Sequence, residues 1–299
     1  MSTFIHGGLG NQLFQFAVAH ENAISANGDI SLLLDTSARK DRPFDLQELI
    51  RNCDQKIKIG YSNPLSIKLK RKVPRYFSKF INFEQEAAPF EFENKFLIKE
   101  NKVINYGYFQ NWRYIEASWE NLKSDFQKVG ELFDNFKFSE NEMQNTAVIH
   151  IRRGDMIKSL TGMGALSSDY YQECVTQIKS KFPLINNFIG VTDDVRGSQE
   201  IANRVGIQIL LGPKELTAWQ TIIFMSKAKV VVAANSTFSW WGAFLSVKNG
   251  GHAYIPDPWF LNWPEEIGDA FMHPEMEVVK SSFEHFESFD SDYKVRDFK

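Results

Sequence analysis

Short apolar segments alternate with helical stretches throughout the second half of the chain. Strands are predicted at residues 146–151, 187–192, 207–211, 229–235 and 252–256. Helices are predicted between them, at residues 170–182, 198–205, 217–228 and 236–247. The run Val230–Ala234 is apolar at every position, as in the strands of a parallel sheet that is covered on both faces. This alternation predicts a doubly wound α/β fold.

The first half of the chain shows the same alternation. A strand at residues 4–6, a glycine turn at 7–10, a helix over 11–27 capped by Gly28 and a strand at 30–35 make one βαβ unit. A further strand at 102–106 precedes a helix at 114–129. The polar segment 134–145 is the predicted linker. We therefore expect an N-terminal α/β domain at residues 1–140 and a C-terminal Rossmann-like domain at residues 141–299.

Composition and charge exclude several classes of protein. The 34 Lys and Arg against 37 Asp and Glu argue against a nucleic-acid binder. The only cysteines, Cys53 and Cys174, form no sequence motif for a disulfide framework or a zinc site. No apolar stretch approaches the ~20 residues that span a bilayer, and no signal peptide is evident, so a cytoplasmic location is expected. The basic segment Lys68–Lys79 is either a peripheral contact with anionic membrane or a solvated helix face.

Polar side chains follow three of the predicted strands. They are His150, Arg152, Arg153 and Asp155 after the first strand of the second half, Asp193 and Asp194 after the next, and Asn235, Ser236 and Thr237 after the fourth. Ligands of open parallel sheets bind at the carboxyl ends of the strands. A guanidinium matches phosphate oxygens bidentately, and a helix N-terminus attracts anions. These clusters predict a phosphate site. The alternatives are a structural network of the arginines with Asp155 and Asp193, and a helix cap at Ser236.

Asp193 and Asp194 need a different partner, because a carboxylate does not bind phosphate directly. Guanine presents a pair of N–H donors that one carboxylate can accept, which favours a guanine contact. A metal ion and a structural turn or cap are the alternatives.

The glycine turn near the N-terminus is a second candidate binding element. Gly8 and Gly10 would let the backbone approach a ligand, with Asn11 and Gln12 as donors at the start of a helix. Leu13 occupies the third glycine position of a dinucleotide fingerprint, and the sequence contains no P-loop. A simple tight turn is the alternative.

Four segments resemble the family 11 glycosyltransferases, the alpha-1,2-fucosyltransferases. They are residues 7–15 (GGLGNQLFQ), 107–110 (GYFQ), 150–155 (HIRRGD) and 235–242 (NSTFSWWG), in that order. The resemblance implies a GT-B architecture of two facing Rossmann-like domains, with GDP-fucose held mainly by the C-terminal one. It implies no metal and no cofactor.

The resemblance also implies roles for the candidate residues. Arg152 would bind the donor pyrophosphate, with Arg153 beside it and His150 toward the nucleoside. Asp193 or Asp194 would contact guanine. Asn235, Ser236 and Thr237 would lie at the phosphate, and the loop of Gly8, Gly10, Asn11 and Gln12 would close over the diphosphate or fucose.

The implied reaction is an inverting transfer of L-fucose from GDP-beta-L-fucose to the 2-hydroxyl of a galactose-terminated oligosaccharide or lipid-linked glycan. Such glycans are units of bacterial surface polysaccharides, including O-antigen, built at the inner face of the plasma membrane. Asp155 is the first candidate for the general base, with Asp35 and His6 as alternatives; the acceptor-binding residues are unknown. Another sugar nucleotide, another linkage or a non-catalytic glycan-binding module are the competing interpretations.

Overall fold

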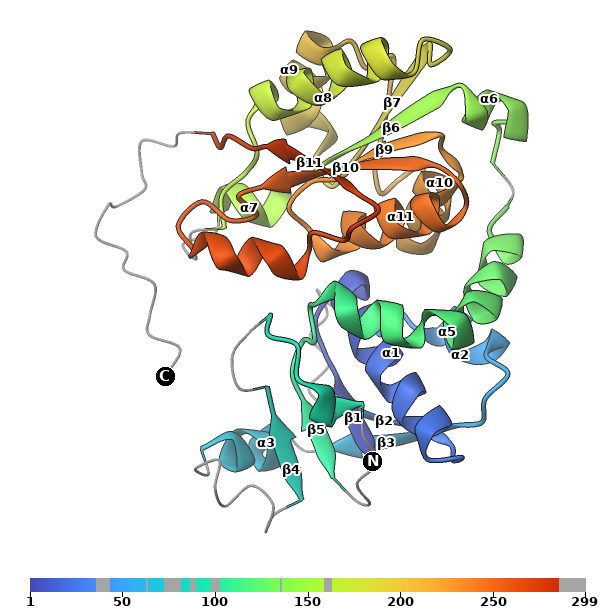
Figure 1. Cartoon of the computed structure of the whole chain (residues 1–299), viewed down its shortest axis with the longest axis vertical. Coiled ribbons are helices and arrows are strands. Elements are labelled where there is room, and N and C mark those ends of the chain that lie inside the picture. Colours follow the sequence, from blue (N-terminus) through green and yellow to red (C-terminus); the bar gives the residue numbers. More distant parts are fainter. Residues whose placement is uncertain are drawn as a thin grey trace. The chain divides into compact units, whose positions relative to one another are not determined.

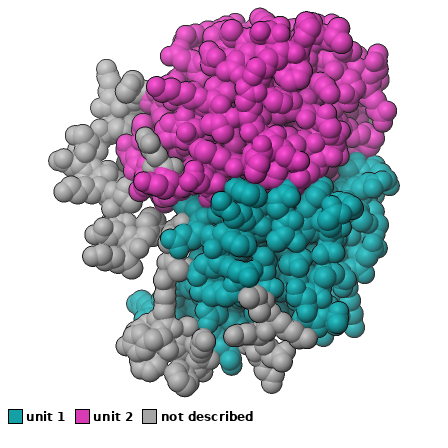
Figure 2. Space-filling view, viewed as in Figure 1, with its two compact units in different colours: residues 1–132 teal, residues 133–299 magenta. Residues whose placement is uncertain are grey.

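The computed structural model describes residues 1–35, 44–62, 64–72, 82–86, 90–97, 103–134, 136–158 and 163–284 (Figure 1). The chain divides into two compact units, Met1–Leu132 and Phe133–Lys299 (Figure 2). The division lies slightly before the predicted boundary at 140/141. Part of the predicted linker is a helix, α6 (Glu140–Gln144), which begins with a capping box between Ser139 and Glu142.

Unit 1 contains a five-stranded sheet in the order β3-β2-β1-β5-β4, with every neighbouring pair parallel. Its strands are β1 (Ser2–Ile5), β2 (Ile30–Asp35), β3 (Ile57–Ser62), β4 (Phe83–Gln85) and β5 (Ile104–Tyr106). The sequence predicts β1, β2 and β5 but not the two edge strands. β3 contains only exposed and half-buried residues and β4 has three residues, so neither has a continuous apolar run.

Helices cover both faces of this sheet. They are α1 (Leu9–Ser25), α2 (Gln47–Asn52), α3 (Pro64–Arg71), the 3-10 helix η2 (Asn94–Phe96) and α5 (Trp112–Leu132). The helix α1 packs on β1 and β2, and α5 packs on α1. Ile67 of α3 packs with Phe4 and Phe83 in a separate cluster. Of the basic segment Lys68–Lys79, residues 73–79 and the Lys68 side chain lie outside the described residues, and the Arg71 guanidinium lies 4.9 Å from the Tyr106 ring centroid.

The end of α1 differs from the prediction. Ala26, not Gly28, is the C-cap, and Asn27 adopts the left-handed conformation with φ 46°. The N–H of Asn27 bonds to the carbonyl of Ile24, and the N–H of Gly28 to that of Ala23. This is a Schellman motif, in which asparagine takes the left-handed position that glycine usually holds.

Unit 2 contains a six-stranded sheet in the order β11-β10-β9-β6-β7-β8, again with parallel pairs throughout. Its strands are β6 (Thr146–Ile151), β7 (Asn187–Thr192), β8 (Ile209–Leu211), β9 (Val230–Val232), β10 (His252–Asp257) and β11 (Glu277–Lys280). Counted from the start of the unit, this is the strand order of a Rossmann fold. The sequence predicts all of these strands except β11, which lies at an edge.

The helices of unit 2 form a layer on each face of the sheet. Besides α6, they are α7 (Gly154–Lys158), α8 (Ser168–Lys181), α9 (Val195–Val205), α10 (Ala218–Lys227), α11 (Thr237–Lys248) and the 3-10 helix η3 (Glu265–Ala270). Figure 1 shows α8 and α9 on one face and α10 and α11 on the other. β6 and β9 are buried at every residue, as two covered faces require. The predicted α/β class with two Rossmann-like units is confirmed. Among the described residues, no helix combines the length and apolar composition needed to cross a bilayer.

Candidate active site

The strand order of unit 2 reverses between β6 and β9. These strands are neighbours, and the chain leaves them toward opposite faces of the sheet, to α8 and to α11. Such a reversal leaves a crevice outside the carboxyl ends of the two strands, where open α/β sheets bind their ligands. Arg152 follows β6 at this edge, and Ser236 precedes α11 at the same edge.

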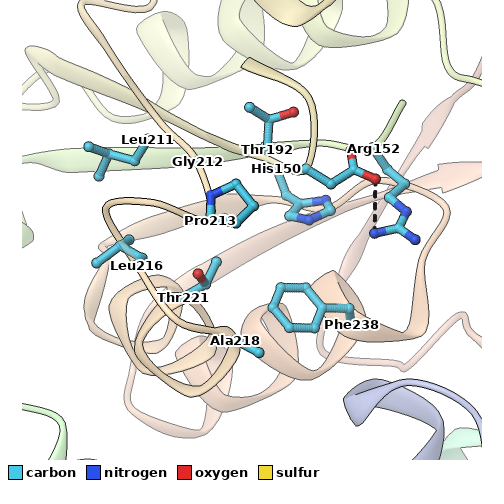
Figure 3. A pocket seen from close by; sticks show the side chains of 11 residues that line it. His150, Arg152, Thr192, Leu211, Gly212, Pro213, Leu216, Ala218, Thr221 and Phe238 are labelled. Carbon is cyan, nitrogen blue, oxygen red and sulfur yellow. Dashed lines mark ion pairs between the residues drawn. The ribbon is translucent and has the colours of Figure 1, made fainter. Parts of the chain in front are cut away.

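A pocket of about 200 Å³ lies beyond the carboxyl ends of β6, β7 and β8 (Figure 3). It is lined by His150, Arg152, Thr192, Asp193, Leu211, Gly212, Pro213, Leu216, Ala218, Thr221 and Phe238. Leu211, Pro213 and Phe238 give it apolar walls, and His150, Arg152, Thr192 and Asp193 supply polar groups at the ends of β6 and β7. Pockets that enclose a whole drug-sized ligand measure roughly 300–1,000 Å³. This pocket therefore suits one part of a larger ligand, such as a nucleobase.

His150 forms part of the pocket wall as a neutral imidazole. Its side chain is buried, and its ring centroid lies 5.6 Å from that of Phe238. Burial, assisted by the positive charge of Arg152 and opposed by Asp193, lowers the pKa of His150 to about 4. Nδ1 of His150 is buried and has no hydrogen-bond partner among the described residues. The ring can thus offer a hydrogen bond to a ligand without bringing a charge.

Two carboxylates hold the Arg152 guanidinium in place. Nε and Nη2 donate to Oδ1 of Asp155 at 3.1 and 2.8 Å, and Nη1 lies 3.0 Å from Oδ2 of Asp193. The side chain keeps 26% exposure and lines the pocket. This is the structural network considered as the alternative to phosphate binding. It also orients the guanidinium in advance, which is the condition for stabilising a developing negative charge without reorganisation.

Asp193 positions the β6–α7 loop as well as Arg152. Its Oδ1 accepts hydrogen bonds from the N–H groups of Arg153 and Gly154 at 3.0 and 3.3 Å. A Cβ on Gly154 would lie 2.5 Å from Oδ2 of Asp193, so this approach requires glycine. Both carboxylate oxygens of Asp193 therefore have protein donors, which corresponds to the structural role considered from the sequence. Its contact with guanine remains a prediction.

Asp194 and Arg153 do not line the pocket. Oδ1 of Asp194 accepts from the N–H of Gly197 at 2.9 Å and caps α9, which is the cap considered from the sequence. The Arg153 guanidinium pairs with Glu284 instead of Asp155 or Asp193. Sequence reasoning missed Glu284, which lies far along the chain in no motif.

The β9–α11 junction supplies a helix N-terminus at the same sheet edge. The Ser236 hydroxyl accepts from the N–H of Phe238 at 3.3 Å and caps α11, of which Thr237 is the first residue. Asn235 is buried, and its amide donates to the carbonyls of Met163 and Gly164 at 3.3 and 2.9 Å. The predicted cap is confirmed at Ser236, and Asn235 braces the junction.

The glycine turn and the Gly-Tyr-Phe-Gln segment meet within unit 1, because β1 and β5 are neighbours. Oδ1 of Asn11 accepts from Nε2 of Gln110 at 2.7 Å. Gln12 donates to the Gly7 carbonyl at 2.8 Å and accepts from the N–H of Asp45 at 2.9 Å. Gly7 has φ +85°, which favours glycine.

Two further predicted residues, Gly8 and Gly10, lie at the start of α1. Gly8 is the N-cap in an extended conformation, and Gly10 is buried in the first turn. The tight turn considered from the sequence is therefore present. A role of this loop toward the donor remains a prediction.

Glu86 is a buried carboxyl of unit 1, beside the Gly-Tyr-Phe-Gln motif, that sequence reasoning missed. Its two oxygens accept from the N–H groups of Tyr108 and Phe109 at 2.6 and 2.7 Å. Burial raises the pKa of Glu86 to about 7, against the lowering effect of these two bonds. A Cβ on Gly107 would lie 2.4 Å from this carboxyl. Glu86 thus fixes the loop that carries the Gly-Tyr-Phe-Gln motif.

Comparisons with known proteins identify the family of the chain. The family model "Glycosyl transferase family 11" matches residues 2–258. An alpha-1,2-colitosyltransferase of Escherichia coli is 28% identical over 90% of this chain and 94% of its own length. The O-antigen biosynthesis glycosyltransferase WbnK of Escherichia coli is 28% identical over 87% of this chain and 95% of its own.

Among solved structures, this chain is similar to the glycosyl transferase of family 9 from Veillonella parvula, with a TM-score of 0.49 and 8% sequence identity. The likeness covers 93% of this chain and 85% of that one. The match of the family model to most of the chain shows that this protein is a glycosyltransferase belonging to family 11.

Proposed function

We propose that the protein transfers L-fucose from GDP-beta-L-fucose to the 2-hydroxyl of a galactose-terminated glycan, with inversion at the anomeric carbon. The observation that carries this proposal is the Arg152 guanidinium, held by two carboxylates at the mouth of a pocket that can accept a nucleobase. A lectin binds its glycan without breaking a bond, so it does not require a cationic group that stabilises a leaving group. A transferase needs it, because the diphosphate leaves with the electron pair of the glycosidic bond.

The pocket suggests how the donor lies. The base would lie against Phe238 and Pro213, with Nδ1 of His150 within the same pocket. The diphosphate would extend toward Arg152 and the N-terminus of α11, whose N–H groups favour an anion. The acceptor oxygen forms the new bond to the anomeric carbon as the bond to the β-phosphate oxygen breaks. The acceptor proton passes to a base or to water.

Asp155 is better placed to orient Arg152 than to accept that proton. Its Oδ1 takes two donors from the guanidinium, while its side chain is 53% exposed. The Asp35 side chain, an alternative base, lies outside the described residues.

A colitose donor is the second candidate. It is favoured by the relative named for alpha-1,2-colitosyl transfer. Colitose is fucose without its 3-hydroxyl, so one GDP site could serve both sugars. Comparison of the two donors with one set of acceptors decides between them.

The deciding experiment is an acceptor array incubated with GDP-fucose, GDP-colitose or a UDP-sugar, with the linkage of the product determined by NMR. Fucosylation of terminal galactose at O2 is expected. GDP should also bind more tightly than UDP in calorimetry, because a site built around guanine leaves its acceptors unpaired with another base. Equal GDP and UDP affinity would overturn the GDP-sugar proposal. Exclusive use of GDP-colitose would make colitose, not fucose, the transferred sugar, and would leave the proposed nucleotide, linkage and acceptor unchanged.

The proposed setting is O-antigen assembly, which the name of one relative supports, in the cytoplasm at the inner face of the plasma membrane. The acceptor would then be a lipid-linked glycan.

A further inference from the structure

Three side chains that are far apart in the sequence meet in unit 1. His20 lies in α1, Cys53 directly follows α2, and Asp125 lies in α5. Their ligating atoms lie within 4.8 Å of one another. His20 and Asp125 are buried and Cys53 is half-buried. None of the three is a residue assigned to the donor or to the reaction.

Hydrogen bonding within the cluster leaves the imidazole poorly satisfied. Nε2 of His20 lies 3.6 Å from Oδ2 of Asp125, which is too long for a well-formed hydrogen bond. Nδ1 of His20 is buried and has no partner among the described residues. Nε2 of His20, the ring nitrogen that faces Asp125, is therefore the atom available to an ion shared by the two side chains.

The same distance fits two ligands of one tetrahedral metal ion. Zinc binds nitrogen and oxygen at about 2.0–2.2 Å, and a tetrahedral angle then separates the two ligand atoms by about 3.4 Å. Thiolate, imidazole and carboxylate are donors that zinc prefers in combination. We propose that His20, Cys53 and Asp125 bind one zinc ion, with water as the fourth ligand.

Charge supports this assignment. A Cys53 thiolate and an Asp125 carboxylate neutralise the two positive charges of the ion, which lowers the cost of placing it in a buried site. On binding, the S–H bond of Cys53 breaks and its proton goes to solvent, while bonds from zinc to the three side chains replace bonds from zinc to water. The Lys128 ammonium pairs with Asp54 and lies 4.0 Å from Oδ1 of Asp125. The other oxygen of Asp125, Oδ2, faces His20.

A reactive cysteine is the competing explanation for the cluster. Cys53 is half-buried and lies beside the Asp125 carboxylate, whereas reactive thiols lie in positively charged surroundings. The ion would join α1, α5 and the end of α2, so it would stabilise unit 1.

Metal analysis of the full-length protein tests the proposal. Untagged protein is stripped with a chelator, incubated with zinc chloride, desalted and analysed by inductively coupled plasma mass spectrometry. About one zinc per chain is expected. At a free zinc concentration roughly 100 times Kd, Tm should rise by about 5 °C or more. Cobalt should give a thiolate-to-metal charge-transfer band.

Variants locate the metal. Cys53→Ala should lose the bound zinc, the Tm shift and the cobalt band. Cys174→Ala, which alters the other cysteine, should keep all three. Asp125→Asn preserves the side-chain volume and should also lose the zinc. It provides the test if Cys53→Ala fails to fold. Wild-type protein that retains no zinc, or Cys53→Ala or Asp125→Asn that retains as much as wild type, would overturn the proposal.

Discussion

Arg152 donates to two carboxylates through three nitrogens, so replacing it by lysine should be severe. Arg152→Lys keeps the charge but cannot donate from a planar fork to both partners and a phosphate. Turnover should fall at least ~100-fold, as when a main donor to the transition state is lost. Arg204→Lys, an exposed arginine paired with Asp169, is the matched control and should keep wild-type turnover. A folded Arg152→Lys enzyme with near-normal turnover would remove Arg152 from the mechanism.

Asp193 can be tested as a guanine ligand or as the support of Arg152. The contacts favour support, so Asp193→Ala should weaken GDP and inorganic pyrophosphate binding in parallel, because the guanidinium loses a partner. Calorimetry with both ligands measures this. Asp194→Ala removes only a helix cap, so it should cost about 1 kcal/mol of stability with little change in GDP affinity. Selective loss of GDP affinity in Asp193→Ala would identify Asp193 as a guanine contact.

His150 should make stability depend on pH. Its pKa is about 4 in the folded protein against 6.5 ordinarily, so the unfolded chain binds the proton more readily. The stability contributed by neutral His150 is present above about pH 6.5 and is lost as pH falls toward 4. Urea unfolding at several pH values should show a shallower decline for His150→Gln than for wild type. Equal slopes would mean that His150 is not held neutral by burial.

At the scale of elements, the β6–α7 loop depends on close approach of its backbone to Asp193. Gly154→Ala would place a Cβ 2.5 Å from Oδ2 of Asp193 and displace the carboxylate that holds Arg152. Transfer activity should fall at least about tenfold, because a displaced Arg152 guanidinium stabilises the transition state less well. Gly130→Ala is the control: Gly130 lies in α5 with nothing within 4 Å of its Cβ position, so the variant should be active and more stable by roughly 0.5–1 kcal/mol. Activity assays and urea unfolding of both variants separate these outcomes.

The elements that the sequence predicted are those with local signals. β6 is a six-residue strand that leads directly into Arg152 and Arg153, so His150 and Arg152 could be placed at the sheet edge in advance. The Ser236 cap is also local. Glu86 and Glu284 gave no such signal, because each is defined by partners distant in the sequence. The sequence likewise could not distinguish Asp193, which supports Arg152, from its neighbour Asp194, which caps α9, because the two adjacent aspartates differ only in the partners they meet in the fold.

At the scale of the whole molecule, each unit has its own parallel sheet and its own hydrophobic clusters. The pocket and the residues that orient Arg152 belong entirely to unit 2. The motif residues Asn11 and Gln110 belong to unit 1. Substitutions at Asn11 or Gln110 therefore test, by their effect on GDP affinity, the predicted role of the unit 1 loop at the donor. Changes in unit 1 that leave GDP affinity intact report on steps after donor binding.

The reaction should not require Mg²⁺ or Mn²⁺. Arg152 and the N-terminus of α11 supply positive potential at the donor site, and a cation between Asp155 and Asp193 would have to displace the guanidinium from both. Enzyme stripped with EDTA and reloaded with zinc should transfer fucose equally well with and without added Mg²⁺ or Mn²⁺. Zinc reloading keeps the site at His20 and Cys53 filled, so any loss of stability there does not enter the comparison. Turnover that depends on Mn²⁺ and disappears in Asp193→Ala, while GDP binding without metal persists, would make Asp193 a metal ligand.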